Sequence, residues 1–92
     1  MSANEEMLEE ILGSKGRIRI LVILAKSQSP LTIYKISKLT GLSTKNTRRN
    51  IEILIKHKWI KEIKVNRATY YKINEDNEAA IEFMKFIKKH FK

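Results

Sequence analysis

The feature that most constrains the fold is the stretch of residues 31–59, LTIYKISKLTGLSTKNTRRNIEILIKHKW. Thr32 is a candidate N-cap for a short helix, because its hydroxyl can accept a hydrogen bond from a free amide of the first turn. Gly41 supplies the backbone freedom that a tight turn between two helices requires. Ser43 can cap a second, longer helix. The stretch therefore predicts two helices joined by a sharp turn.

The second of these helices is expected over residues 44–57, and its two faces differ. Thr47, Ile51 and Leu54 recur at helical spacing and form an inner stripe. The outward face is polar, and its first two turns hold these cationic and amide side chains: Lys45, Asn46, Arg48 and Arg49. Such a helix buries one side and offers the other to a partner.

Three more helices are expected outside this stretch. Residues 4–12 form a short acidic amphipathic helix, and residues 15–26, with Ser14 as N-cap, form one that is apolar on two sides. A third spans residues 75–91; acids, including Glu75, open it and lysines close it, as the helix dipole favours. A helix that is apolar on two sides must be covered twice. The two-helix stretch is one cover, and terminal helices or a second copy of the chain are the other.

The periodicity changes at Trp59. Residues 59–65 and 69–73 are rich in β-branched and aromatic side chains, which favour strands, and residues 66–68 join them. This pattern predicts a β-hairpin. A two-stranded hairpin is marginal alone, so it must pack on the helices.

The net charge of +9 is unevenly distributed over the 92 residues. Residues 1–13 contain four acids and no base, whereas residues 14–72 contain fifteen Lys and Arg against two acids, Glu52 and Glu62. Residues 73–92 contain four of each. Solubility does not require acids to be excluded from so long a segment, so the charge placement favours a polyanionic partner.

Several functions are disfavoured by what the sequence lacks. It has no cysteine, so disulfides, thiolate metal sites and cysteine catalysis are excluded. His57 and His90 lie far apart, and no glycine-rich phosphate loop occurs, so we expect no enzyme activity, no metal site and no cofactor. No apolar run approaches the roughly 18 residues of a membrane span, and the acidic N-terminus is unlike a signal peptide. We expect a cytoplasmic protein, associated with the nucleoid if its polyanion is DNA.

Three segments resemble a known family: LGSKGRIRIL (12–21), LTIYKISKLTGLSTKNTRRNIEILIKHKWI (31–60) and RATYYKIN (67–74). They resemble winged-helix transcriptional regulators of the ArsR, MarR and PadR type, especially small archaeal ones. The resemblance covers about two-thirds of the chain, and LTGLS at 39–43, followed by Arg49, is its most specific part. Family members commonly carry glycine where Lys58 stands. A left-handed lysine there would cost roughly 1 kcal/mol or more; otherwise the helix ends differently and the wing tilts.

The resemblance implies a winged helix-turn-helix of the α+β class, mainly helical, with a small hairpin and extra terminal helices. It implies that helix 44–57 lies in the major groove of double-stranded DNA and that the wing, residues 65–69, reaches the backbone or minor groove. It also implies a homodimer built from the first and last helices. We expect one domain over residues 1–92: an acidic helix (1–13), the winged core (14–73) and a dimerisation helix (74–92).

Side-chain chemistry assigns the candidate DNA contacts. The planar forks of Arg48 and Arg49 suit guanine and Asn46 suits adenine, while phosphate is favoured at the helix start. The full candidate set is Tyr34, Lys35, Lys38, Ser43, Thr44, Lys45, Asn46, Arg48, Arg49 and Arg67. The alternative for each arginine is a solvated helix residue or an i,i+4 ion pair such as Arg48 with Glu52.

The unmatched apolar faces of helices 15–26 and 75–91 predict the dimer surface. Its candidate residues are Ile20, Ile23, Leu24, Phe83, Met84, Ile87 and Phe91. The alternative is that the two helices simply pack on each other within one chain.

Taken together, these patterns predict a dimeric protein that binds double-stranded DNA and regulates transcription, most simply as a repressor. Three rivals share the fold: a plasmid or chromosome partition factor that binds centromere-like repeats, a DNA-coating protein, and an interaction module whose basic surface meets an acidic protein. A partner protein, such as a partition or transcription factor, is possible. The sequence does not rank repression against partition.

Overall fold

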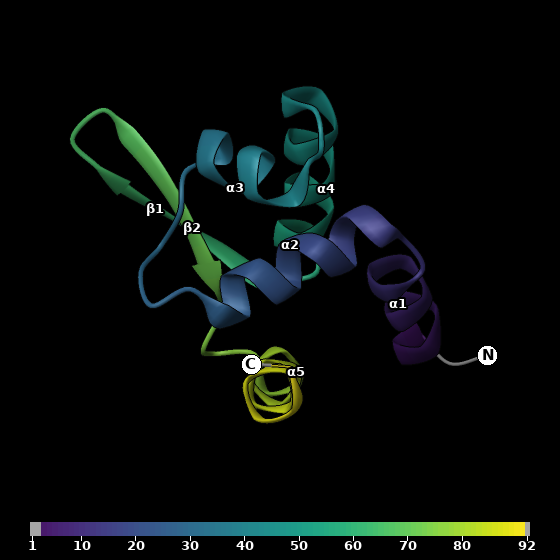
Figure 1. Ribbon diagram of the computed structural model, residues 1–92. Helices are drawn as coiled ribbons and strands as arrows, with labels where there is room; N and C mark the ends of the chain where they lie inside the picture. Colours follow the sequence, from purple (N-terminus) through teal and green to yellow (C-terminus); the bar gives the residue numbers. More distant parts are fainter. Residues whose placement is uncertain (1–2, 92) are drawn as a thin grey trace.

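The computed structural model describes residues 3–91, and within them it contains five helices and one hairpin (Figure 1). The elements are α1 (Ala3–Leu12), α2 (Lys15–Lys26), α3 (Ile33–Thr40), α4 (Thr44–Lys56), β1 (Ile60–Val65), β2 (Ala68–Ile73) and α5 (Glu78–His90). Helix α2 lies in the middle, with α3 and α4 on one side and α5 on the other (Figure 1). Helix α1 packs near one end of α2, and the hairpin extends away past α3 (Figure 1). The predicted α+β class and the predicted element order are confirmed.

Three hydroxyl caps begin helices where the sequence predicted them. The side-chain oxygens of Ser14, Thr32 and Ser43 each accept a hydrogen bond from the amide three residues ahead, at 3.4, 3.1 and 3.1 Å. Gly41 ends α3 in the left-handed region, with φ of +79°. Only glycine adopts this conformation at no steric cost, which explains the sharp turn before α4. Among the described helices, none is both long and apolar enough to cross a membrane.

Helix α5 begins later than the acidic pattern predicted. Asn77 is its N-cap and accepts a hydrogen bond from the amide of Ala80 at 3.2 Å. Glu75, expected within the helix, lies before it, where its two carboxylate oxygens bind Lys61 and Lys72 at 2.7 Å each. The prediction was wrong because two full positive charges from the hairpin attract the carboxylate more than the partial charge of a helix end.

The hairpin turn is shorter than predicted. Val65 pairs with Ala68, so the turn contains two residues, Asn66 and Arg67, and Ala68 belongs to the strand. Asn66 has φ of +56°. Asparagine tolerates this left-handed conformation better than most residues, so a tight turn forms without glycine.

Lys58 adopts the left-handed conformation, with φ of +62°, at the position where the resembled family commonly has glycine. Its carbonyl accepts hydrogen bonds from the side-chain amides of Asn74 and Asn77, at 2.9 and 3.0 Å. The next amide, that of Trp59, donates to the Leu54 carbonyl at 3.0 Å. These bonds hold the reversal between α4 and β1 and offset the backbone strain at Lys58.

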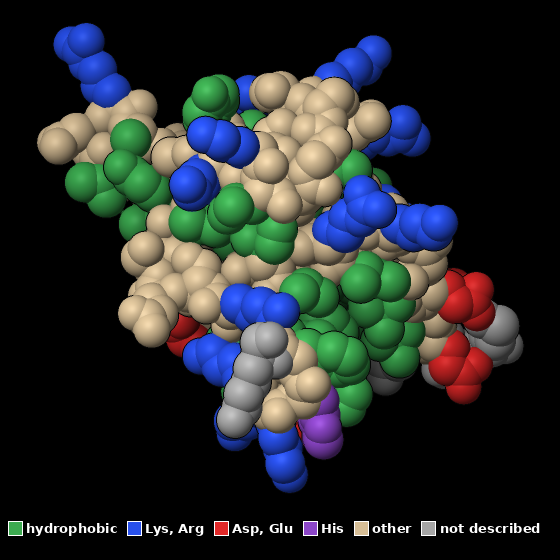
Figure 2. Space-filling view, in the orientation of Figure 1, with side chains coloured by type: hydrophobic (Ala, Val, Ile, Leu, Met, Phe, Trp, Pro, Cys, Tyr) green, Lys and Arg blue, Asp and Glu red, His purple; other side chains and the backbone are tan. Residues whose placement is uncertain are grey.

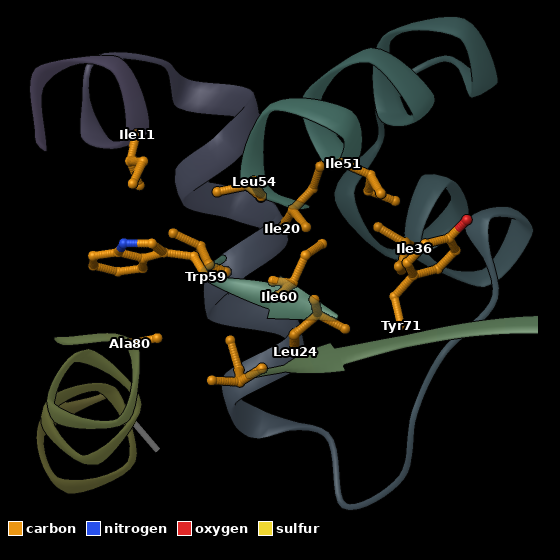
Figure 3. Close-up of a cluster of buried hydrophobic side chains, with 12 residues drawn as sticks. Ile11, Ile20, Leu24, Ile36, Ile51, Leu54, Trp59, Ile60, Tyr71 and Ala80 are labelled. Carbon is orange, nitrogen blue, oxygen red and sulfur yellow. The ribbon is translucent and has the colours of Figure 1, made fainter. Parts of the chain in front are cut away.

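The core receives side chains from every helix and from both strands, as Figure 3 shows. Its labelled members are Ile11, Ile20, Leu24, Ile36, Ile51, Leu54, Trp59, Ile60, Tyr71 and Ala80. The predicted inner stripe of α4 is confirmed: Thr47, Ile51 and Leu54 are all buried. Burial of this stripe turns the opposite side of α4 toward solvent.

Two residues predicted for the dimer surface belong to the core instead. Ile20 and Leu24 are 0% and 5% exposed, and they point at core side chains from α4 and β1 (Figure 3). Ile87 on α5 is 6% exposed. The prediction was wrong for Ile20 and Leu24 because a helix that is apolar on two sides does not reveal which side its own chain covers.

Candidate nucleic-acid interface

The N-terminal half of α4 presents its polar side chains to solvent. Thr44, Lys45, Asn46, Arg48 and Arg49 are all exposed. The first turn contains no acid, and its dipole and free amides carry partial positive charge. This end of the helix is therefore suited to phosphate and to base edges.

Helix α3 contributes a second exposed group. Tyr34 is 75% exposed, and Lys35 and Lys38 are exposed beside it. On the inner side, the hydroxyl of Thr40 donates to the Ile36 carbonyl at 2.8 Å. The amphipathic division of α3 thus places the predicted tyrosine and lysines outward.

The wing is fixed to α3 through the loop before that helix. Leu31 and Tyr71 exchange two backbone hydrogen bonds, at 3.0 and 2.7 Å, so the loop pairs with the outer edge of β2. Arg67 lies exposed in the turn of the hairpin. The tip of the hairpin extends beyond α3 (Figure 1). The strand pairing therefore determines where this distant arginine lies relative to α4.

A hollow of about 330 Å³ lies between α3, α4 and β2. Its lining includes Tyr34 from α3, Arg48 from α4 and Thr69 from β2. Tyr71 lies at its floor, where burial is the main cause of the raised pKa of its phenol, followed by the nearby Glu62. Tyr34 and Arg48 are thus brought onto one surface with the wing.

Within residues 3–91, four lysines of the hairpin and α4 form ion pairs, whereas the predicted DNA contacts and the cations of α2 and α5 form none. The paired lysines lie on the two strands and at the end of α4: Lys61 and Lys72 with Glu75, Lys64 with Glu62, and Lys56 with Glu10. The predicted DNA contacts form no ion pair among the described residues: Lys35, Lys38, Lys45, Arg48, Arg49 and Arg67. Arg48 accordingly does not pair with Glu52 there. The unpaired cations remain available to an external anion.

One supporting contact was missed from the sequence. Arg17 on α2 donates to the carbonyl of Glu10 at 2.7 Å and to the side-chain oxygen of Asn50 on α4 at 2.9 Å. A Cβ at Gly16 would lie 2.7 Å from the Asn50 amide nitrogen, so this glycine allows α2 and α4 to approach closely. The contact joins residues 33 positions apart, and no local pattern predicts such a pairing.

Of the other predicted dimer residues, Phe83, Ile87 and Phe91 line a groove between α2 and α5, whereas Ile23 and Met84 do not. The groove, about 340 Å³, is lined by Ile18, Val22, Lys26, Phe83, Phe86, Ile87 and Phe91. Phe86 and Phe91 are each 52% exposed, and Phe86 was not predicted. Figure 2 shows a large hydrophobic patch on this face of the molecule. Phe83 and Met84 are half-buried against the core, and Ile23 is half-buried on α2.

Comparison with solved structures identifies the fold. The chain is similar to a predicted DNA-binding transcriptional regulator from E. coli, with 22% identity, 96% of this chain and 90% of that chain covered, and a TM-score of 0.77. It is similar to the transcriptional regulator HlyU from Vibrio vulnificus, with 17% identity, coverages of 98% and 90%, and a TM-score of 0.80.

A third similar structure is the homodimeric winged helix-turn-helix DNA-binding domain of a possible ArsR-family regulator from Mycobacterium bovis. The identity is 18%, 97% of this chain and 85% of that chain are covered, and the TM-score is 0.73. No protein-family model and no curated protein matches the sequence. At these identities the comparisons establish the winged helix-turn-helix fold. They agree with the ArsR part of the resemblance; its archaeal, MarR and PadR parts stay predictions.

Proposed function

We propose that this protein binds double-stranded DNA as a homodimer and regulates transcription, most simply as a cytoplasmic repressor without catalytic activity. One observation carries the proposal: six cations that form no ion pair within residues 3–91 lie on α3, α4 and the wing tip. A folded protein gains nothing from holding uncompensated cations together, because like charges repel. Phosphates of a duplex would neutralise them and release bound counterions.

The fold supports a specific docking on DNA. Helix α4 enters the major groove, where Arg48 and Arg49 reach guanine and Asn46 reaches adenine. The start of α4 contacts phosphates through Ser43, Thr44 and Lys45. The outer side of α3 contacts phosphates through Tyr34, Lys35 and Lys38. Arg67 at the wing tip contacts the backbone or the minor groove. Base contacts then provide specificity, and phosphate contacts provide affinity.

The proposed dimer uses the α2–α5 groove. Half-exposed aromatic side chains on a soluble protein mark a contact surface, and Phe86 and Phe91 supply them here. The similar domain from Mycobacterium bovis is homodimeric, which supports this assembly. A two-fold dimer would meet two half-sites about one helical turn, roughly 34–36 Å, apart.

The experiment is selection of bound duplexes from a random pool, followed by titration of the selected sequence at several salt concentrations. A palindromic site, with affinity that falls steeply as salt rises, is expected. A matched control is Lys88→Ala on the exposed part of α5, which should bind as the unaltered protein does.

Other results would replace the proposed role. A long stepped footprint spreading from one site would indicate partition or DNA coating. A single short operator near the protein's own promoter would agree with repression. Failure to select any duplex would contradict DNA binding and favour an interaction module.

A further inference from the structure

Two adjoining hollows run along α2 where it faces α3. The larger, about 450 Å³, is lined by Ile23, Lys26, Ser27, Leu31, Lys35 and Leu39. The smaller, about 310 Å³, is lined by Ile18, Arg19, Val22, Ile23, Leu39 and Thr40. Because Ile23 and Leu39 belong to both, the hollows form one continuous depression, here called the α2–α3 groove. It adjoins the groove of the proposed dimer, because Ile18, Val22 and Lys26 of α2 line both.

The walls of the α2–α3 groove include apolar side chains that stay partly exposed. Leu39 is 50% exposed, whereas Ile36, three residues earlier on α3, is fully buried and fills the core. Ile23 and Leu31 are half-buried. A leucine held half in solvent beside other apolar side chains indicates a contact surface, because burying it would release water from apolar area.

The rim of the groove is cationic. Arg19 lies toward one end and donates to the Thr40 carbonyl at 3.5 Å, while Lys26 and Lys35 line the other hollow. No acid lines either hollow, and neither lysine forms an ion pair with a described residue. An apolar strip bordered by cations is complementary to an apolar strip bordered by acids.

The dimensions favour a helix over a small molecule. From Ile18 to Lys26 the groove follows about 12 Å of α2, at 1.5 Å per residue. It is open to solvent along its length, whereas small ligands bury about 70–90% of their surface. A helix laid in a groove needs only one buried stripe. DNA does not suit it, because phosphates gain nothing from apolar walls.

We propose that the α2–α3 groove binds an acidic amphipathic helix of a partner protein, with its apolar stripe on Leu39 and Ile23 and its acids toward Lys26, Lys35 and Arg19. Lys35 is also a candidate phosphate contact, so the acids of a bound helix would compete with DNA for it. This last consequence rests on the proposed function. The docking itself does not.

The test is an NMR titration of the full chain with a synthetic helical peptide that carries leucines at i, i+3, i+4 and i+7 and glutamates elsewhere. The amide signals of Ile23 and Leu39 should shift, and Leu39→Ala should weaken binding about tenfold. The matched control is Leu8→Ala, which shortens a 42% exposed leucine on α1 and should leave the affinity unchanged. Lys26→Ala should weaken binding and lower its salt dependence, whereas Lys85→Ala on α5 should not.

Three results would overturn the proposal: no shift of groove signals at millimolar peptide, equal binding of a peptide with lysines in place of the glutamates, or shifts confined to Phe86 and Phe91. Binding of the selected duplex is measured in parallel, both for the unaltered protein and for Leu39→Ala. If the peptide fails while DNA binds, only the docking is wrong. If the peptide binds and no duplex does, only the proposed function is wrong.

Discussion

The side-chain amide of Asn77 donates a 3.0 Å hydrogen bond to the carbonyl of Lys58, and the oxygen of the same side chain caps α5. Asn74 donates a second hydrogen bond to that carbonyl, at 2.9 Å. The left-handed residue between α4 and β1 is thus held by the segment that follows the wing. The direction in which the hairpin leaves α4 depends on this contact, and with it the position of Arg67 relative to Arg49.

Lys58→Gly is expected to stabilise the fold. Glycine adopts positive φ without the steric cost that lysine carries at +62°. The free energy of unfolding should rise by about 1 kcal/mol in urea titrations. Lys58→Ala is the matched control, because it removes the charge and keeps the strain, so it should change little. Equal effects of glycine and alanine would contradict strain at this residue.

Substitutions of Asn77 should separate its two hydrogen bonds. Serine can still cap α5 but has no amide for the Lys58 carbonyl, whereas alanine loses both contacts. We expect Asn77→Ser to lower the free energy of unfolding by about 1 kcal/mol and Asn77→Ala by about 2 kcal/mol. Thermal and urea unfolding measure both. If serine and alanine are equally destabilising, the cap contributes nothing here.

The pH dependence of stability should contain a contribution from Glu75. Hydrogen bonds from Lys61 and then Lys72 lower its pKa to about 2, from an ordinary value of 4.5. Because the unfolded chain binds this proton more readily, the contribution is complete above about pH 4.5 and is lost as pH falls toward 2. Urea titrations at pH 7 and pH 3 should show a smaller acid loss for Glu75→Gln than for the unaltered protein. The same loss in both would remove Glu75 as a cause.

Glu10 should report on the contact between α1 and the end of α4. His57 Nε2 lies 3.2 Å from a Glu10 carboxylate oxygen, and this close polar contact is the main cause of the lowered pKa of Glu10. In His57→Ala the pKa of Glu10, followed by NMR, should rise toward its ordinary value. Lys56→Ala should raise it less, since Lys56 acts only through charge at 3.9 Å. A larger effect of Lys56 would place the cause of the lowered pKa in the charge of Lys56 instead of the contact with His57.

Arginines on α4 and on the wing should differ in what they contribute to DNA binding. Arg49→Ala should cost about 1–3 kcal/mol on the selected site and relax its sequence preference. Arg67→Ala should weaken all duplexes similarly and reduce the salt dependence by about one ion. Fluorescence anisotropy on the selected and a shuffled duplex measures both. If neither substitution alters binding, α4 does not lie in the groove.

The helix starts at Ser14, Thr32 and Ser43 were predictable because each cap joins residues three positions apart. The buried stripe of α4 was predictable for the same reason, since helical periodicity assigns its inner face. The outward position of Arg48 and Arg49 follows directly. The candidate interface on α4 was therefore within reach of the sequence.

Contacts between distant segments could not be predicted from the sequence. Glu75 could not be assigned to Lys61 and Lys72 without the strand register, and the pairing of Arg17 with Asn50 crosses 33 residues. Ile20 and Leu24 looked as available to a second copy as any apolar residue of α2.

The sequence alone thus determined the order of the elements, the capped helices and the cationic face of the helix-turn-helix. These features depend on neighbours within one or two turns of helix. Only the tertiary structure decided which apolar side of α2 the chain itself covers, which lysines are neutralised and how Lys58 is held. Those depend on packing and on charge between segments that meet only after folding.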